Sequence, residues 1–314
     1  MATVEPNLTR GDPRDELIAV VAIMRANAVS ATKLSALLDN VGSAIDLLRD
    51  QSMVFETGVR SLLLGAVGQT HIEAAAVEIS AWEAAGYTAV TVLHPSYPTN
   101  LQEVFDKPPL LFVTGKWDDH ADSRAVAVVG TRNPSADGRR RAALLVKTLT
   151  EASITVISGL AKGIDAVAHR AALKAGARTV AVMGTGIARR YPRENASLAD
   201  AIVASGGALI SQFFPTQGPT KWTFPVRNIT MSGLSIATIV IEAGVTSGAM
   251  IQARAALTHG RSVFLPSSLV ETHPWARALV EDGVQGAHAT EVSSPTDVID
   301  RLDFTLPEMS SLVA

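Results

Sequence analysis

Residues 158–169 read SGLAKGIDAVAH, and they directly follow the apolar run ITVI at residues 154–157. An apolar run of strand length, a glycine-hinged turn and an alanine-rich helical stretch are typical of a strand–turn–helix unit in an α/β protein. The turn leaves backbone N–H groups at a helix N-terminus beside Lys162, and such a site suits an anion, most often a phosphate. The stretch therefore predicts an α/β fold with a phosphate site at this turn, and it leaves open whose phosphate is bound.

The same alternation of apolar runs and helical patterns recurs after residue 124. The strand-length runs are AVAVVG (125–130), ITVIS (154–158), TVAVMG (179–184), ALISQ (208–212), ATIVIE (237–242) and SVFLP (262–266). The helical patterns cover residues 137–151, 164–175, 195–205, 247–259 and 273–282. Near-continuous apolar strands joined by helices predict a doubly wound parallel sheet that is covered on both faces, with its ligand at the carboxyl ends of the strands.

The N-terminal part of the chain is different, because its apolar residues recur at helical spacing. Ser30 stands where it would cap one of these helices. A proline-rich connector and the apolar run LLFVTG (110–115) then lead into the α/β part. We expect a flexible tail at residues 1–15, a small all-helical domain at 16–85, the α/β domain at 86–304 and a second tail at 305–314.

Composition narrows the class of protein. The chain has 314 residues and no cysteine, which excludes disulfides, thiolate metal sites and thiol catalysis. Its first residues resemble neither a signal peptide nor a transit peptide, and no apolar run approaches the roughly 20 residues of a membrane span. We therefore expect a cytoplasmic protein without a membrane partner.

Charge is distributed unevenly along the chain. The formal net charge is −3, yet the segment from Arg124 to Arg193 holds 13 Lys and Arg against 3 Asp and Glu. The rest of the chain is correspondingly acidic. Such segregation indicates a local anion-binding face on an acidic body, although the triplet at 139–141 could equally be one solvated helical turn.

Four segments at the expected strand ends carry the chemistry of a phosphate site. They are VVGTRNPSADGRR (128–140), the opening stretch, VMGTGIARRYPREN (182–195), and FPVRNITMSGLS (224–235) followed by EAGVTSGAMIQAR (242–254). Glycine turns, fixed cations and free helix N-termini recur in them, and the carboxyl ends of parallel strands meet at one edge. The residues that we expect to line one phosphate-binding crevice are Gly130, Arg132, Ser158, Gly159, Lys162, Gly163, Arg227, Asn228, Ser247 and Gly248.

Asp165 and His169 lie four residues apart, on one face of the helix after the opening turn. The pair resembles half of a catalytic constellation, but such pairs are more often structural. We expect structural support, with the imidazole bonding the carboxylate so that the turn is held in place.

Other ligand and reaction classes lack their markers. The segment GTGIAR at 184–189 begins like a dinucleotide fingerprint but has no third glycine, and neither a full Walker A sequence nor a G-x-S-x-G elbow occurs. Histidines and acids show no metal-ligand spacing. We expect no cofactor and no metal. Glu242 and, less favourably, Glu194 are the acids placed to serve a nucleotide hydrolase.

Five motifs, taken together and in order, resemble the DNA-processing protein A (DprA/Smf) family. They are VAVVGTRNPS (126–135), VISGLAKGIDAVAHRAAL (156–173), VAVMGTGIARRYPREN (180–195), FPVRNITMSGLS (224–235) and SGAMIQARAALTHGRSVF (247–264). The resemblance extends from about residue 17 to residue 302. It departs from the family pattern at Ile229, where a second arginine is usual, and at the N-terminal domain, where the glycines of a helix-hairpin-helix motif are missing.

The resemblance implies an extended Rossmann-like fold behind a helical domain of the SAM or helix-hairpin-helix type. It implies a protein without catalytic turnover that binds single-stranded DNA, dimerises through the Rossmann-like domain and helps load RecA in natural transformation and recombination. Arg132, Lys162, Arg227 and Asn228, with the backbone of Gly159, Gly163 and Gly248, would contact the DNA. Two alternatives stay open: a nucleotide-binding sensor or nucleotide hydrolase on the same fold, and a protein-interaction module that has lost DNA binding.

Overall fold

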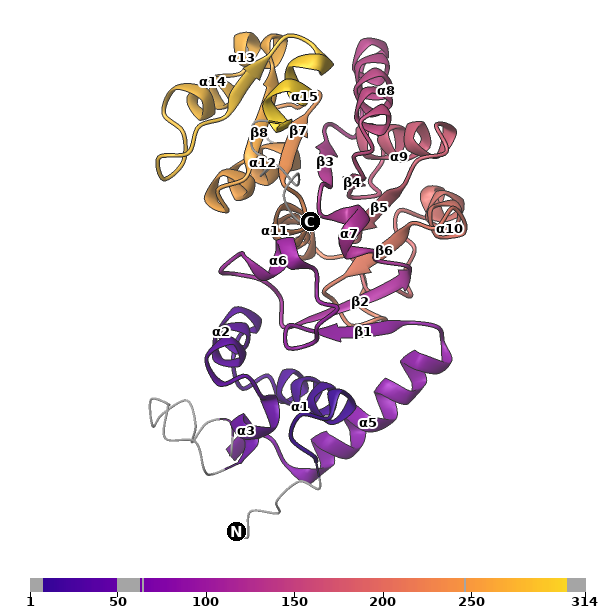
Figure 1. The fold of residues 1–314 in the computed structure, drawn as a ribbon, viewed down its shortest axis with the longest axis vertical. Helices are drawn as coiled ribbons and strands as arrows, with labels where there is room; N and C mark the ends of the chain where they lie inside the picture. Colours follow the sequence, from indigo (N-terminus) through magenta and orange to yellow (C-terminus); the bar gives the residue numbers. More distant parts are fainter. Residues whose placement is uncertain (1–7, 50–62, 64, 246, 304–314) are drawn as a thin grey trace, which may run out of the picture. The chain divides into compact units, whose positions relative to one another are not determined.

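The computed structural model describes residues 8–49, 63, 65–245 and 247–303 (Figure 1). The tail predicted at 305–314 lies outside these residues, as do the first seven residues of the tail predicted at 1–15. The chain divides into two compact units. The smaller comprises residues 1–114, 185–189 and 210–218, and the larger comprises 115–184, 190–209 and 219–314. The boundary predicted between a helical domain ending at residue 85 and an α/β domain beginning at residue 86 is not the boundary between these two units, and it stays a prediction.

The described part of the smaller unit is rich in helices. They are α1 (Pro13–Ala26), α2 (Ala31–Val41), α3 (Ala44–Leu48), α5 (Gln69–Ala84) and the short α6 (Thr99–Gln102). The Asp12 carboxylate caps α1, and the Ser30 hydroxyl caps α2 as predicted, by accepting a hydrogen bond from the Lys33 N–H. Strand β1 (Thr88–Thr91) pairs antiparallel with β2 (Leu110–Gly115), which corresponds to the predicted run LLFVTG.

The larger unit is built on a parallel sheet, as predicted. Its strands are β3 (Val126–Val129), β4 (Val156–Ser158), β5 (Thr179–Val182), β6 (Ala208–Ser211), β7 (Ala237–Val240), β8 (Ser262–Pro266) and β9 (Thr290–Val292). They lie in the order β6-β5-β4-β3-β7-β8-β9, and β6 ends with two residues assigned to the smaller unit.

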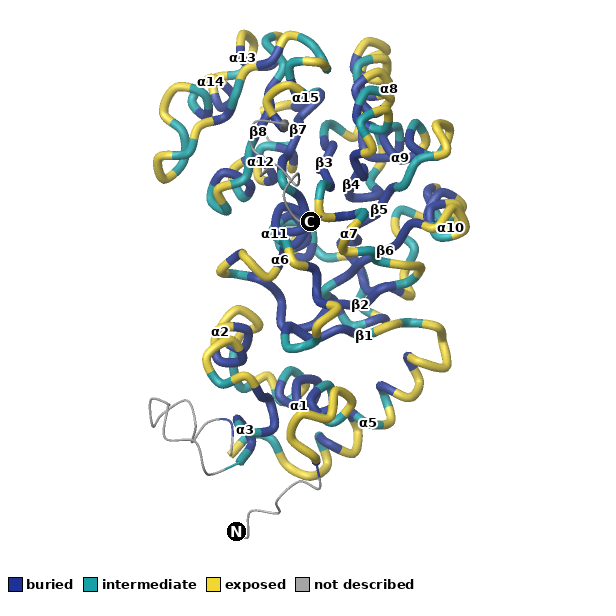
Figure 2. The backbone as a smooth tube through the Cα atoms, in the orientation of Figure 1, coloured by how far each residue is buried: buried dark blue, intermediate teal, exposed yellow. Residues whose placement is uncertain are grey.

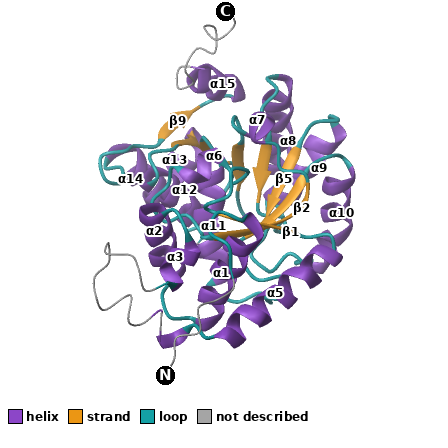
Figure 3. Ribbon diagram, turned by 60° about the horizontal axis from the view of Figure 1, so that its bottom comes forward, coloured by secondary structure: helices purple, strands orange, loops and turns teal. Residues whose placement is uncertain are grey.

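Helices stand on both sides of the strands of the larger unit (Figure 3). They are α7 (Asp119–Asp122), α8 (Ala136–Glu151), α9 (Ile164–Lys174), the 3₁₀ turn η1 (Arg193–Asn195), α10 (Ala196–Ala204), α11 (Thr223–Leu234), α12 (Gly248–Thr258), α13 (Ser267–Thr272), α14 (Pro274–Glu281) and α15 (Pro295–Asp303). All five predicted helices are confirmed to within two residues at each end. The crossovers leave the pairs β3–β4, β3–β7, β4–β5, β7–β8 and β8–β9 parallel, which is the doubly wound arrangement.

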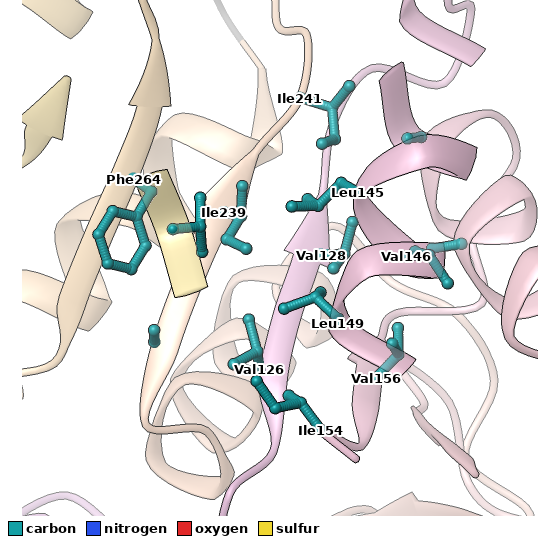
Figure 4. Packing of buried hydrophobic residues seen from close by; sticks show 14 of the residues in the cluster. Val126, Val128, Leu145, Val146, Leu149, Ile154, Val156, Ile239, Ile241 and Phe264 are labelled. Atoms are coloured by element: carbon teal, nitrogen blue, oxygen red, sulfur yellow. The ribbon is translucent and has the colours of Figure 1, made fainter. Parts of the chain in front are cut away.

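The core of the larger unit lies between the sheet and the helices α8, α9 and α15. Figure 4 shows Leu145 and Leu149 of α8 against Val126 and Val128 of β3. These side chains lie four and two residues apart, which are the spacings that keep residues on one face of a helix and of a strand. The strands are dark in Figure 2 because both of their faces are covered, and this explains their near-continuous apolar sequence.

Candidate functional site

A cleft of about 870 Å³ opens where the strand order reverses in the larger unit. Strand β3 pairs with β4 on one side and with β7 on the other, so that the loops after these strands diverge at their carboxyl ends. Ligands of open α/β sheets bind at such a switch point. Of the predicted site residues, the cleft is lined by Gly130, Arg132, Asp165, Arg227, Asn228, Ser247 and Gly248. A small recess beside it adds Gly159 and Lys162.

The loop after β3 presents Arg132 to solvent. Its guanidinium carbon lies 5.5 Å from the centroid of the Phe224 ring, which gives the cation an aromatic support. Ser135 ends the loop as the cap of α8, because its hydroxyl accepts a hydrogen bond from the Gly138 N–H at 2.9 Å. Glu242 accepts hydrogen bonds from the Ser135 N–H at 3.2 Å and from the Ser135 hydroxyl at 2.8 Å. The carboxylate suggested for a hydrolase is thus engaged in holding this loop.

Three buried side chains shape the loop after β4. The Asp165 carboxylate accepts hydrogen bonds from the N–H groups of Gly159 at 3.1 Å and Ala161 at 3.4 Å. The Asn195 amide donates to the carbonyls of Leu160 at 2.9 Å and Ala161 at 3.2 Å. Arg227 Nη1 donates to the Gly159 carbonyl at 2.6 Å. Leu160 can therefore hold a positive φ of 57°, which an isolated leucine rarely adopts.

Two glycines of this loop are required by close approach. A Cβ on Gly159 would overlap the Arg227 guanidinium, and a Cβ on Gly163 would overlap the Thr131 carbonyl. Gly163 also has a φ of 79°, in the region that favours glycine. The loops after β3 and β4 are therefore in direct contact, and the Ile164 N–H donates to Thr131 O at 3.2 Å.

Arg227 lies in α11, and this corrects the expectation that residues 224–235 lie at a strand end. Its side chain is only 6% exposed, and Nη1 also donates to the Val182 carbonyl at 2.7 Å. The sequence hid this helix because polar residues such as Asn228 and Thr230 are buried in it, so that no amphipathic period appears. Arg227 therefore joins the ends of β4 and β5 beneath the cleft.

Burial controls the charges under the cleft. Burial raises the pKa of Asp165, while the positive charge of Arg227 and the two backbone N–H groups lower it. Burial lowers the pKa of the Arg227 guanidinium, and the negative charge of Asp165 opposes that change. The two groups therefore support each other's ionised forms at a position where both side chains are almost completely buried.

His169 has a different partner from the one predicted. Its Nδ1 lies 2.8 Å from the Thr179 hydroxyl, which donates to the Val156 carbonyl at 2.7 Å, so that Nδ1 carries the proton. The predicted bond to the Asp165 carboxylate is wrong, because that carboxylate faces the backbone of the turn. Burial lowers the pKa of His169 to about 3, and the charges of Arg227 and Arg170 contribute in the same direction. The ring is a neutral core residue.

The other predicted residues occupy three kinds of position. The Ser158 hydroxyl is buried and donates to the Val128 carbonyl at 2.6 Å, so it belongs to the sheet. Lys162 is exposed, and its ammonium forms an ion pair with Glu194. The Asn228 amide donates to the Gly248 carbonyl at 3.2 Å, while the Ser247 hydroxyl caps α12 by accepting from the Ala249 N–H.

Among the lining residues that the sequence did not single out, Tyr191, Lys221 and Phe224 bear on ligand binding. The rings of Tyr191 and Phe224 lie 5.9 Å apart between centroids. Lys221 adds an exposed cation from the segment before α11. Each of the segments RRYPREN and KWTFPVRN contains an aromatic residue close to cations. Aromatic side chains next to cations are typical of nucleic-acid sites, so this pattern could have indicated Tyr191 and Phe224.

Comparison with known proteins places the chain. The model of a family described as DNA recombination-mediator protein A matches residues 88–303, which include every residue discussed for the cleft. The chain belongs to this family. The resemblance predicted from the five motifs is thereby confirmed, and the family gives the chain a role in DNA processing and recombination.

Individual members of the DNA recombination-mediator protein A family agree with this assignment. The chain is 37% identical over 225 residues to the DNA processing protein DprA of Bacillus subtilis (strain 168), which covers 71% of this chain and 74% of that protein. It is 40% identical over 216 residues to Protein Smf of Escherichia coli (strain K12), which covers 67% of this chain and 55% of that protein.

Solved structures of the family share the fold. The X-ray structure of DNA processing protein A from Streptococcus pneumoniae has a TM-score of 0.68 at 30% identity, and the match covers 90% of this chain and 96% of that one. DNA processing protein A from Helicobacter pylori, described with a unique single-stranded DNA binding mode, has a TM-score of 0.60 at 23% identity, covering 70% and 97%. Within the described residues, no helix has the length and apolar character to cross a bilayer.

Proposed function

We propose that this protein binds the backbone of single-stranded DNA in the cleft and acts as a recombination mediator. The observation that carries the proposal is the lining of the cleft. Arg132 and Lys221 are exposed cations, and Arg227 lies just below them. The one acid among the described lining residues is Asp165, which is buried and bonded to the backbone of the turn.

The chemistry of the cleft fits a strand better than a duplex or a free nucleotide. Exposed cations bind phosphates without reading the sequence, and the rings of Tyr191 and Phe224 offer faces on which unpaired bases stack. The Glu242 carboxylate is bonded to Ser135, which disfavours the nucleotide hydrolase. The relative from Helicobacter pylori, described as binding single-stranded DNA, supports the same proposal.

The finer parts of the proposal follow the family resemblance. The protein would protect incoming DNA, help load RecA onto it, form a homodimer through the Rossmann-like domain, act in the cytoplasm during natural transformation, and turn over no substrate. RecA filament growth on a strand, with and without the protein, tests the RecA part. Growth at equal rates would remove RecA from the proposal.

Fluorescence anisotropy with a labelled thymidine strand, measured at several salt concentrations, tests the DNA site. We expect Arg132→Ala to weaken binding about tenfold at low salt and to reduce the slope of log affinity against log salt by about 0.7, which is the value for one phosphate of a single strand. Lys147→Ala removes an exposed charge of α8 outside the cleft and serves as the control. Equal losses in both variants would contradict the cleft as the binding site.

A further inference from the structure

We infer that Glu194 is a built-in competitor for the phosphate at Lys162, and that it eases release of the bound strand. The inference rests on the proposed function. The Lys162 ammonium, the one cation of the loop after β4, is held by the Glu194 carboxylate. A phosphate that binds Lys162 therefore competes with this carboxylate for the ammonium, and the carboxylate can take Lys162 back when the phosphate leaves.

Glu194 is positioned for this competition by the same loop. It lies in η1, and the next residue, Asn195, is 2% exposed and donates to the carbonyls of Leu160 and Ala161. The backbone that carries the acid is thus bonded to the loop that carries Lys162. An ion pair formed by two freely moving surface chains would lack this fixed spacing.

Lys162 also lies at the place where a strand in the cleft would pass. The recess that it lines shares Arg132, Tyr191 and Phe224 with the main cleft. Both members of the pair are about half exposed, with side-chain exposures of 52% for Lys162 and 50% for Glu194. A phosphate can therefore approach the ammonium from solvent without any movement of the fold.

We expect Glu194 to change the binding affinity only modestly and to act mainly on the dissociation rate of the strand. An exposed ion pair is weak, so that a strand already held at Arg132 and Lys221 displaces Glu194 readily. Each time the contact between Lys162 and a phosphate opens, the Glu194 carboxylate can bind the Lys162 ammonium again. Affinity changes within one interface appear mainly in the dissociation rate, and we therefore assign the effect of Glu194 to release.

The test compares Glu194→Gln with Glu151→Gln. Glu151 forms another exposed lysine–glutamate pair, with Lys147 on α8, so its variant removes the same charge away from the cleft. With a labelled thymidine strand of about 20 nucleotides, we expect Glu194→Gln to bind three- to fivefold more tightly, mostly through slower dissociation, and Glu151→Gln to bind as the unaltered protein does. The gain corresponds to the free energy of one exposed ion pair.

A Lys162→Ala background separates competition from simple repulsion. If Glu194 acts through Lys162, the gain from Glu194→Gln falls below about 1.5-fold once the lysine is absent. Equal gains with and without Lys162, or no gain in either background, would overturn the inference while leaving the proposed function standing. Failure of the unaltered protein to bind the strand at low salt would overturn the proposed function, and the inference with it.

Discussion

The loops after β3 and β4 both bring a glycine turn and a cation to the same cleft, but they are stabilised in different ways. In the loop after β3, Arg132 is exposed and Ser135 is held by a half-buried acid, Glu242. In the loop after β4, the backbone is bonded to side chains that are almost completely buried. One loop presents a cation, while the other is a rigid wall whose shape depends on cations and acids below the surface. The residue type alone therefore does not tell which arginine binds a ligand.

The largest expected effect is a difference in unfolding free energy between variants of Arg227 and Arg132. Arg227→Ala leaves the carbonyls of Gly159 and Val182 without their donor, and each unsatisfied buried group costs about 1–3 kcal/mol. We expect the variant to lose about 4 kcal/mol of unfolding free energy, measured by denaturant titration. Arg132→Ala, which removes an exposed side chain, should change it by less than about 0.5 kcal/mol. Similar losses in both variants would break the distinction between a presenting loop and a structural one.

The next effect is the pH dependence of the unfolding free energy that comes from His169, which is buried below the loop after β4. The pKa of His169 is about 3 in the fold and about 6.5 in the unfolded chain, so acid protonates the unfolded state first. The stability from neutral His169 is complete above pH ~6.5 and is lost as the pH falls, by about 3 kcal/mol between pH ~7 and ~4. The raised pKa of Asp165 acts in the opposite direction.

His169→Leu isolates the histidine, because Asp165 remains in both proteins and leucine has no charge at any pH. The variant loses the bond to Thr179 and is less stable at neutral pH, yet its unfolding free energy should fall about 3 kcal/mol less between the two pH values. Parallel curves for the two proteins would show that the pKa of His169 is the same in the fold as in the unfolded chain.

The features of the fold and the site that the sequence predicts are those set by interactions between neighbours in the chain. Strands β2 to β8, the helices α8, α9, α10, α12 and α14, and the cap at Ser30 depend on neighbours in sequence, and each was predicted. The partners of Arg227 and His169 come from other strands, so that no spacing reveals them. Helix α11 was missed because its buried polar residues show no helical hydrophobic period.

The smallest expected effect comes from adding a single methyl group to a glycine, either in the loop after β4 or at the start of α12. A Cβ on Gly159 would overlap a guanidinium that is fixed by two carbonyls, and Gly159→Ala should cost about 2 kcal/mol of stability. Gly248 provides the matched control, since a Cβ there would meet nothing within 4 Å at the exposed start of α12. Gly248→Ala should be neutral or up to about 0.5 kcal/mol more stable, because alanine favours the helix and restricts the unfolded chain. If both changes prove neutral in denaturant titration, the guanidinium can move aside, and the loop after β4 is then as adaptable as the loop after β3.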